Sequence, residues 1–332
     1  MTNADLSASP AAATVVRPTL RGHIAICRID HWFKNVFVLP GIVVAVGMTG
    51  AGLDASLFQR ILLGIISVCL VASSNYVINE VLDAPSDRAH PVKHTRPVPS
   101  GQVSIPVAYV QWLALMVVGV GIGRLVSLPF AITVGVLWVM GCLYNIPPVR
   151  SKDLPYLDVL SESVNNPLRM LAGWFIVVPG ASTAAPGSLL LSYWMIGCYF
   201  MAMKRYAEFR DIGDQARAAA YRKSFGFYTE HRLLISIMFY GSAAMLFLGA
   251  FVMRYRLELI LAFPLVALVM AIYLALAFKP NSAVQRPEGL YREPVLMAAV
   301  VGCAVLTAVL LFVDIPSLPQ LFTPTAPTQP HP

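Results

Sequence analysis

A dense mixture of acids and bases follows the second apolar run of the chain, where residues 79–97 read NEVLDAPSDRAHPVKHTRP. Asn79, Asp83 and Asp87 recur every four residues, so a helix would carry their three oxygen-bearing side chains along one stripe. Magnesium takes a few hard oxygen ligands and completes its shell with water and substrate phosphate. The stripe is therefore a candidate magnesium site, and its three residues are candidate metal ligands and catalytic residues.

Pro85 lies inside this stripe. Because proline lacks an amide hydrogen, it predicts a break or kink of the helix near Ala84. The break would place Asp87 on a following turn, so the pair Asn79 and Asp83 is the firmer part of the prediction.

Basic side chains follow the acids at the same edge of the apolar run. Lys93 and Arg96 can bind phosphate oxygens through charge-assisted hydrogen bonds, Arg in a bidentate fork. Acids beside bases suit a metal–diphosphate, because the acids hold the cation and the bases hold the anion. The alternative is that the bases are ordinary positive residues of a cytoplasmic loop and that the acids add solubility.

A second charged loop begins at the end of another apolar run, where residues 203–229 read MKRYAEFRDIGDQARAAAYRKSFGFYT. Lys204, Glu208 and Asp211 follow i, i+4, i+7 spacing and therefore share one helix face. Glu208 either ligates a second metal or pairs with Lys204, a helix contact worth about 0.2–0.5 kcal/mol. Two later bases are expected to contact phosphate or lipid headgroups: Arg222 and Lys223.

Two charges lie inside the fifth apolar run, which is the most polar one. Asp158 and Arg169 are eleven residues apart, so a continuous helix would place them three turns apart on the same side. Both are candidate substrate-binding residues, and a structural pairing inside the membrane is the alternative for either one. Near the first apolar run, the segment RIDHWFKN adds Lys34, and Trp32 is most simply an interfacial anchor.

The rest of the chain is strongly apolar. Of 332 residues, 57% are hydrophobic and 12% are charged, and the mean hydropathy is +0.68. Soluble domains average about 25% charged residues, and a bilayer core penalises ionised groups. The composition therefore predicts an all-α, polytopic membrane protein. Nine windows approach the roughly 20 apolar residues that a crossing needs: 35–51, 58–79, 104–123, 128–147, 156–179, 188–207, 233–253, 257–278 and 294–314.

The distribution of Lys and Arg predicts the orientation. With the N-terminus inside, the inner segments hold nineteen of these residues and the outer segments hold four, and cytoplasmic loops are the ones that keep positive charge. The N-terminus is therefore expected in the cytoplasm and the C-terminus outside. Residues 1–20 are expected to form a disordered cytoplasmic N-terminus without a cleaved leader, 21–316 the transmembrane domain, and the Pro/Thr-rich residues 317–332 a disordered tail.

The motifs resemble those of a known family. NEVLDAPSDRAHPVKHTRP resembles the first aspartate-rich motif, NDxxDxxxD, of the UbiA-type intramembrane transferase superfamily, and RIDHWFKN looks like its RPxQWxKN opening. LRMLAGW and MKRYAEFRD…YRKSFGFYT are similar to the decaprenyl-phosphate phosphoribosyltransferase branch, which has GKRYAE followed by RKSLxxYT. The resemblance covers most of the chain. It implies nine transmembrane helices around a central cavity open to the cytoplasmic side, in a bacterial plasma membrane.

The resemblance also implies an activity and a site. The activity is Mg²⁺-dependent transfer of 5-phosphoribose from phosphoribosyl diphosphate to a polyprenyl phosphate, feeding lipid-linked arabinose for a cell-wall or nodulation-factor-type glycan. The stripe and Glu208 would hold the metal. Substrate-binding roles fall on Lys34, Lys93, Arg96, Asp158, Arg169, Lys204, Arg205, Tyr206, Arg222 and Lys223. Two departures are Glu80, where the motif has Asp, and Asp30 with His31 in place of Pro-x-Gln.

Two other functions compete with this one. A UbiA-type prenyltransferase would join a prenyl diphosphate to an aromatic or other acceptor, but that donor brings one anionic headgroup, whereas the phosphoribosyl reaction brings together three anionic groups. A transporter with a charged vestibule is the second alternative, and the lack of a visible internal repeat counts against it. The expected partners are the diphosphate donor, the lipid phosphate and the membrane, without nucleic acid; the sequence leaves the oligomeric state open.

Overall fold

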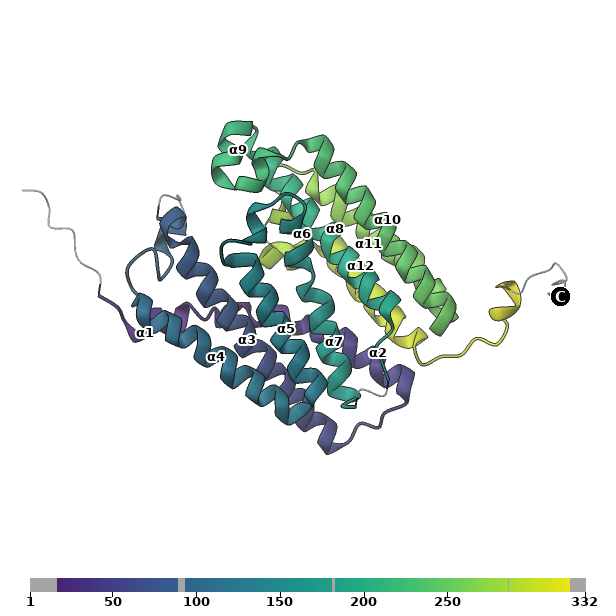
Figure 1. Ribbon diagram of the computed structural model, residues 1–332. Coiled ribbons are helices and arrows are strands. Elements are labelled where there is room, and N and C mark those ends of the chain that lie inside the picture. The colour runs from purple at the N-terminus through teal and green to yellow at the C-terminus, as the bar shows by residue number, and fades with distance from the viewer. Residues whose placement is uncertain (1–16, 89–92, 181–182, 286, 323–332) are drawn as a thin grey trace, which may run out of the picture.

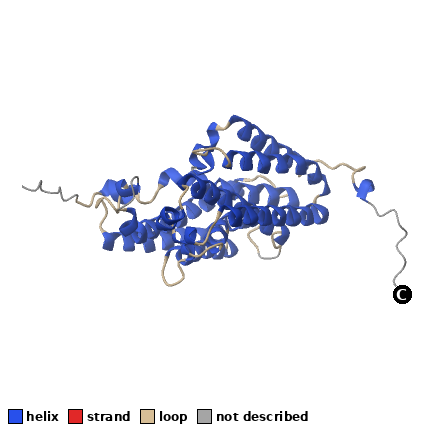
Figure 2. Cartoon of the chain, turned by 90° about the horizontal axis from the view of Figure 1, so that it is seen from above, coloured by secondary structure: helices blue, strands red, loops and turns tan. Residues whose placement is uncertain are grey.

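The computed structural model describes residues 17–88, 93–180, 183–285 and 287–322, and the regular structure within these ranges is helical (Figure 2). The α-helices are α1 (Leu20–Ala25), α2 (Leu39–Thr49), α3 (Ala55–Asp87), α4 (Ile105–Val126), α5 (Leu128–Asn145), α6 (Leu157–Ser163), α7 (Asn165–Val177), α8 (Gly187–Ile212), α9 (Gln215–Tyr221), α10 (Glu230–Tyr255), α11 (Phe263–Ala277) and α12 (Pro294–Leu310). Short 3-10 segments join them, among them Ile29–Val38 and Ser151–Asp153.

The all-α membrane architecture predicted from the composition is confirmed. Each of the nine predicted windows contains helix, and six helical stretches of the described residues are long and apolar enough to cross a membrane. These are Leu20–Thr49, Ala55–Asp87, Ile105–Val126, Leu128–Asn145, Glu230–Tyr255 and Leu257–Ala277. The other three windows hold α8, the shorter α12, and the pair α6 and α7. The expected disordered ends fall mostly outside the described residues, and that prediction stays open.

The fifth window is two helices, because the chain is interrupted at Val164. Pro167 has no amide hydrogen to donate to the carbonyl of Ser163 one turn earlier, and its ring crowds that carbonyl. The side chain of Asn165 donates to the neighbouring carbonyl of Glu162, at 2.9 Å. A polar side chain thus satisfies one backbone carbonyl at the junction of the two helices, as a low-dielectric setting favours.

Pro85, in contrast, does not break α3, so that part of the prediction is wrong. The helix runs through Pro85 and ends at Asp87, and the amide of Arg88 still donates to the carbonyl of Ala84 at 3.1 Å. Because α3 ends two residues after the proline, few helical hydrogen bonds depend on the disturbed turn. Asp87 consequently stays on the stripe that begins at Asn79.

The helices of the described residues pack around three apolar clusters. One joins mainly α2, α3, α5 and α7, a second joins mainly α6, α8, α10 and α11, and a smaller third joins the ends of α3 and α4 to the loop between them. The neighbours α3 and α4, and likewise α8 and α10, lie side by side along their lengths (Figure 1). Where α2 crosses α7, the backbones touch: a Cβ atom on Gly41 would lie 1.8 Å from the carbonyl oxygen of Met170, and one on Gly173 would lie 2.1 Å from that of Val38. Small residues permit such close crossings in membranes.

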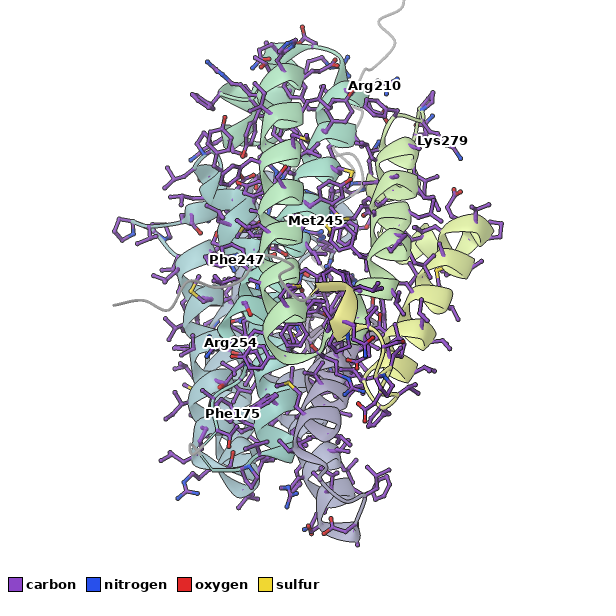
Figure 3. The ribbon with its side chains drawn as sticks, turned by 90° about the vertical axis from the view of Figure 1, so that its right-hand side faces the viewer. Phe175, Arg210, Met245, Phe247, Arg254 and Lys279 are labelled. Atoms are coloured by element: carbon purple, nitrogen blue, oxygen red, sulfur yellow. The ribbon has the colours of Figure 1, made fainter. Side chains whose placement is uncertain are left out.

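Charged residues mark the two ends of the bundle. Figure 3 shows Arg210 and Lys279 toward one end, whereas Arg254 lies toward the other end of α10. The distribution of Lys and Arg predicts the inner side for Arg210 and Lys279 and the outer side for Arg254, so the fold provides the separation that this orientation needs. Which end faces the cytoplasm stays a prediction.

Candidate functional site

The candidate site is built on the last turns of α3, where the stripe lies. The Oδ1 atom of Asp83 accepts hydrogen bonds from the Nη2 atom of Arg150 at 2.8 Å and from the Nζ atom of Lys152 at 2.6 Å. Both bases come from the loop after α5, nearly seventy residues away in the sequence. Burial lowers the pKa of Lys152, and the carboxylate of Asp83 acts in the opposite direction. The stripe's central acid is therefore held between two cations.

Asp87, one turn further along, meets the bases of the loop that follows α3. Its Oδ2 atom accepts a hydrogen bond from Arg96 at 2.6 Å, and the ammonium of Lys93 lies 4.0 Å from its Oδ1 atom. Lys93 also lies over the ring of Tyr221 in α9, 5.2 Å from the centroid. Asp87 is 4% exposed. The structure thus brings the acids and bases of the first motif into contact and carries that motif to the second charged loop.

A chain of amides orients Asn79. The Nδ2 atom of Asn145 donates to the carbonyl of Gly141 at 2.9 Å, which turns its Oδ1 atom toward Asn79 and Lys152. That oxygen accepts from the Nδ2 atom of Asn79 and, at 2.9 Å, from Lys152. With its Nδ2 atom engaged, Asn79 can offer its Oδ1 atom to a metal. The network therefore selects the amide orientation that a metal ligand requires.

Arg150 is fixed by three acceptors. Besides Asp83, its guanidinium donates to the carbonyl of Asn145 and to the carboxylate of Asp153, both at 3.1 Å. Its backbone lies in the left-handed region, with φ +34°, a conformation that costs about 1–3 kcal/mol in a residue other than glycine. Asp153 also pairs with Lys223 at 3.2 Å. The surrounding contacts therefore hold a strained residue against the acid stripe.

The opposite wall comes from α8 and the loop after α9. The Oε2 atom of Glu208 accepts from Arg205 at 3.2 Å, so its ion partner is Arg205 and not the neighbour expected from i, i+4 spacing. The charges of both Asp87 and Glu208 act on Lys93, as does that of Arg222. Arg222 in turn acts on Glu208 and lies 5.9 Å from the ring centroid of Phe225. The two charged loops therefore face one another across the site.

Asp158 was expected to bind substrate, but it lies fully buried in a closed network. It accepts from the Nε atom of Arg205 and the hydroxyl of Ser224, each at 3.2 Å, and from the hydroxyl of Tyr228 at 2.7 Å. Burial raises the pKa of Tyr228, and the adjacent carboxylate of Asp158 reinforces the shift, so the phenol stays a donor. The network ties α6 to α8 and to the segment before α10, which is a structural role.

Asp158 and Arg169 lie on separate helices, α6 and α7, and their side chains have different partners. Arg169 instead donates to the Oδ1 atom of Asn35 at 3.0 Å. Lys34, beside Asn35, is half-buried and repels the ammonium of Lys204 electrostatically. Lys34, Arg169 and Lys204 therefore belong to a second basic region that lies between the N-terminal segment, α7 and α8.

Two acidic residues of the motifs accept hydrogen bonds from loop backbone and do not point to the stripe. Glu80, 2% exposed, accepts from the backbone amide of Val98 at 3.0 Å and lies 3.9 Å from Arg28. Asp211 accepts from the backbone amide of Asn281 at 3.1 Å. Both carboxylates hold loops in place and are not directed at the stripe.

Two aromatic residues also have structural contacts. Tyr206, expected to bind substrate, is buried edge-on against Phe278 with ring centroids 5.4 Å apart. Trp32, expected to be an interfacial anchor, donates from its indole to the hydroxyl of Ser73 at 2.9 Å. Tyr206 thus packs α8 against the end of α11, and Trp32 holds the N-terminal segment on α3.

Sequence reasoning missed the residues that contact the stripe from outside α3: Asn145 on Asn79, and Arg150 with Lys152 on Asp83. They lie in the short segment YNIPPVRSKD, whose two bases next to an apolar run were counted only as orientation signals. The concentration of bases and an acid within four residues was the available signal. Its direction toward α3 depends on the fold and could not be obtained from spacing.

The donor set fits magnesium better than a metal held by protein alone. Across the described residues, no three His, Cys, Asp or Glu side chains gather closely enough to form a metal cage. The stripe offers two carboxylates and an amide oxygen, which suits an ion that shares its ligand shell with water and phosphate. The surrounding bases supply contacts for the phosphate.

The chain is similar to several known proteins. The sequence pattern of the UbiA prenyltransferase family matches residues 37–292. The decaprenyl-phosphate phosphoribosyltransferase of Corynebacterium glutamicum is 31% identical over 227 residues, which are 63% of this chain and 60% of that protein. Nodulation protein NoeC of Azorhizobium caulinodans is 27% identical over 229 residues, 68% of this chain and 70% of NoeC.

The fold has solved counterparts. The structure of a UbiA homolog from Archaeoglobus fulgidus bound to DMAPP and Mg²⁺ superposes with a TM-score of 0.65 at 18% identity, covering 89% of this chain and all of the archaeal one. The family pattern covers more than half of the chain, and the helical architecture agrees with it. The chain belongs to the UbiA prenyltransferase family.

Proposed function

We propose that the protein transfers 5-phosphoribose from phosphoribosyl diphosphate to a polyprenyl phosphate of the decaprenyl type, with Mg²⁺ as cofactor. One observation carries the proposal: the two acids of the stripe are surrounded by a surplus of bases from three separate parts of the chain. The bases are Lys93, Arg96, Arg150, Lys152 and Arg222. Such a surplus suits a donor with phosphate at both ends and a phosphorylated acceptor.

In the proposed reaction, the stripe binds the metal and the bases bind the diphosphate. The oxygens of Asn79, Asp83 and Asp87 would hold Mg²⁺, which neutralises charge on the leaving diphosphate. Lys93 and Arg96 bind and orient diphosphate oxygens. The bond between ribose C1 and the diphosphate breaks as an oxygen of the lipid phosphate bonds to the same carbon. That acceptor is already an anion, so no general base is needed, and catalysis rests on positioning and charge stabilisation.

The opposite wall completes the proposal. Lys34, Arg169 and Lys204 would contact the remaining phosphates, and Arg222 with Lys223 would border the entrance. Glu208 as a second metal ligand stays a prediction; its contact with Arg205 favours a role in orienting that base. The name of the corynebacterial relative supports the transferred group and the acceptor, and the relative named as a nodulation protein supports nodulation as one destination of the product.

A prenyltransferase is the second candidate, because the archaeal fold neighbour is a structure with DMAPP and Mg²⁺. The test uses membranes that contain the protein, decaprenyl phosphate, and either labelled phosphoribosyl diphosphate or labelled prenyl diphosphate. We expect label to enter the lipid phosphate from the first donor alone, in a product heavier by one phosphoribosyl group. Label from prenyl diphosphate alone would establish the second candidate, and flux without turnover would establish a transporter.

Two variants of neighbouring acids sharpen the assay. Asp83→Asn should reduce turnover at least about 100-fold, the usual cost of losing an electrostatic group at the reacting centre. Glu80→Gln is the matched control, because its carboxylate lies on the same helix but contacts Val98 and Arg28. Turnover of Glu80→Gln should stay within about threefold of the parent. Equal loss in both variants would contradict the assignment of the stripe.

A further inference from the structure

The carboxylate of Asp83 is already neutralised by the protein itself. Arg150 and Lys152 both donate to its Oδ1 atom, at 2.8 and 2.6 Å. Neither base belongs to α3, and both are fixed from other elements: Lys152 by Asn145 at 2.9 Å, and Arg150 by Asp153 at 3.1 Å. The pairs are therefore built into the fold and are not chance contacts of flexible surface side chains.

The charge around the stripe disfavours a lone divalent cation. Asp87 is likewise paired, with Arg96 at 2.6 Å. The carboxylates of Asp83 and Asp87 are thus already neutralised by basic side chains. A metal ion that binds alone would have to displace Arg150 and Lys152 from Asp83 against the repulsion of their positive charges. Nearby like charge opposes binding, and the partial burial of these side chains, 8% exposed for Lys152, reduces screening by water.

An incoming diphosphate changes this balance, because its oxygens can receive the hydrogen bonds that Asp83 now receives. Charge-assisted bonds from Arg and Lys to phosphate are at least as favourable as those to carboxylate. Arg222 supplies a further donor at the same place: within the described part of the chain, its buried Nε atom has no hydrogen-bond partner. The basic side chains can therefore bind diphosphate as they leave the carboxylate of Asp83.

We propose that Arg150 and Lys152 act as an exchangeable pair of counter-cations for Asp83, so that divalent metal and diphosphate bind as a coupled unit. Diphosphate takes over the two bases, and the freed carboxylate then ligates the metal. The inference rests on the proposed metal–diphosphate site, but not on which group is transferred. Coupling of this kind is reciprocal: the factor by which diphosphate tightens the metal equals the factor by which the metal tightens diphosphate.

The test measures Mn²⁺ binding to the full chain in detergent by equilibrium dialysis, with and without inorganic diphosphate. A protein-free chamber accounts for the complex that Mn²⁺ and diphosphate form in solution. For the parent protein, we expect diphosphate to tighten Mn²⁺ about tenfold or more, the scale of coupling between close charge pairs. Equal Mn²⁺ affinity with and without diphosphate would overturn the proposal.

Removing one of the two bases should change Mn²⁺ binding in opposite directions: the affinity without diphosphate should rise, and the gain on adding diphosphate should shrink. Lys152→Met should tighten Mn²⁺ alone about tenfold and should reduce the effect of diphosphate, since one competing cation is gone. Arg150→Gln tests the same point if the buried Lys152→Met variant does not fold. Lys279→Met is the matched control: it removes a positive charge that pairs with Glu293 at 3.8 Å, outside the stripe, and should change neither affinity.

Asp83→Asn completes the set, since it should abolish the specific Mn²⁺ binding in all backgrounds. If Lys152→Met and Arg150→Gln leave Mn²⁺ binding unchanged or weaken it in the absence of diphosphate, the two bases are not competitors of the metal and the proposal fails. Because diphosphate is common to phosphoribosyl and prenyl donors, intact coupling with failed phosphoribosyl transfer would refute only the proposed function.

Discussion

Replacing Asp158 distinguishes a structural acid from a substrate-binding one. This carboxylate is fully buried and accepts three hydrogen bonds, from Arg205, Ser224 and Tyr228. Removing one partner of a buried ion pair costs about 3–5 kcal/mol. Arg205 retains Glu208 at 3.2 Å as a counter-charge, so Asp158→Ala should cost about 3 kcal/mol, the lower end of that range. Asp158→Asn keeps one acceptor and the shape, and should cost about 1–2 kcal/mol.

The assay is the fraction of monodisperse protein that survives heating in detergent, measured by size-exclusion chromatography. The midpoint for Asp158→Ala should fall by about 5–10 °C, and that for Asp158→Asn by less. The KM for the donor, measured well below the midpoint, should stay within about threefold of the parent, because no direct contact with the donor is lost. An unchanged midpoint with a large rise in KM would refute the structural role and restore the substrate contact expected from sequence.

Two further variants test other parts of the fold. Gly173→Ala would place a Cβ atom 2.1 Å from the carbonyl oxygen of Val38, so α2 and α7 must separate and the yield of monodisperse protein should drop sharply; a normal yield would show that the crossing is loose. Arg256→Gln removes an ion pair to Asp314 at 2.6 Å and a bond to the carbonyl of Leu310 at 3.0 Å. Hydrogen exchange at the end of α12 should then accelerate severalfold while the rest of the bundle is unaffected, and uniform acceleration would contradict this local role.

The stripe on α3 was predictable from sequence, because residues four apart share one face of a helix regardless of how the helix packs. Helical backbone through Asp87 is enough to align Asn79, Asp83 and Asp87. Pro85 does not interrupt it, because α3 ends two residues later. The all-helical membrane architecture was predictable for a similar reason, since composition and window length are independent of tertiary contacts.

Other parts of the site depend on packing and were not predictable from spacing. The bases on Asp83 come from the loop after α5, and only the packing of α5 against α3 brings them to the stripe. The separate partners of Asp158 and Arg169 likewise depend on packing, because the fifth window holds two helices and Pro167 stands in the first turn of the second. Glu208 had two neighbouring bases within one turn, and the choice of Arg205 follows from Asp158 holding that guanidinium from its other side.

The crossing of α2 and α7 has a mechanical consequence. With glycine on both helices there, main chain rests on main chain, and no rotamer change can open a gap or let one helix slide past the other. The two helices must move as one stiff wall. By contrast, α12 packs mainly on α11, and its end meets α2 through side chains, since a Cβ atom on Gly47 would lie 3.5 Å from the Cβ atom of Leu311. Motion that admits the lipid tail of the proposed acceptor therefore belongs to the side-chain contacts of α12, and a crosslink between α2 and α7 should leave turnover unchanged where one that fixes α12 slows it.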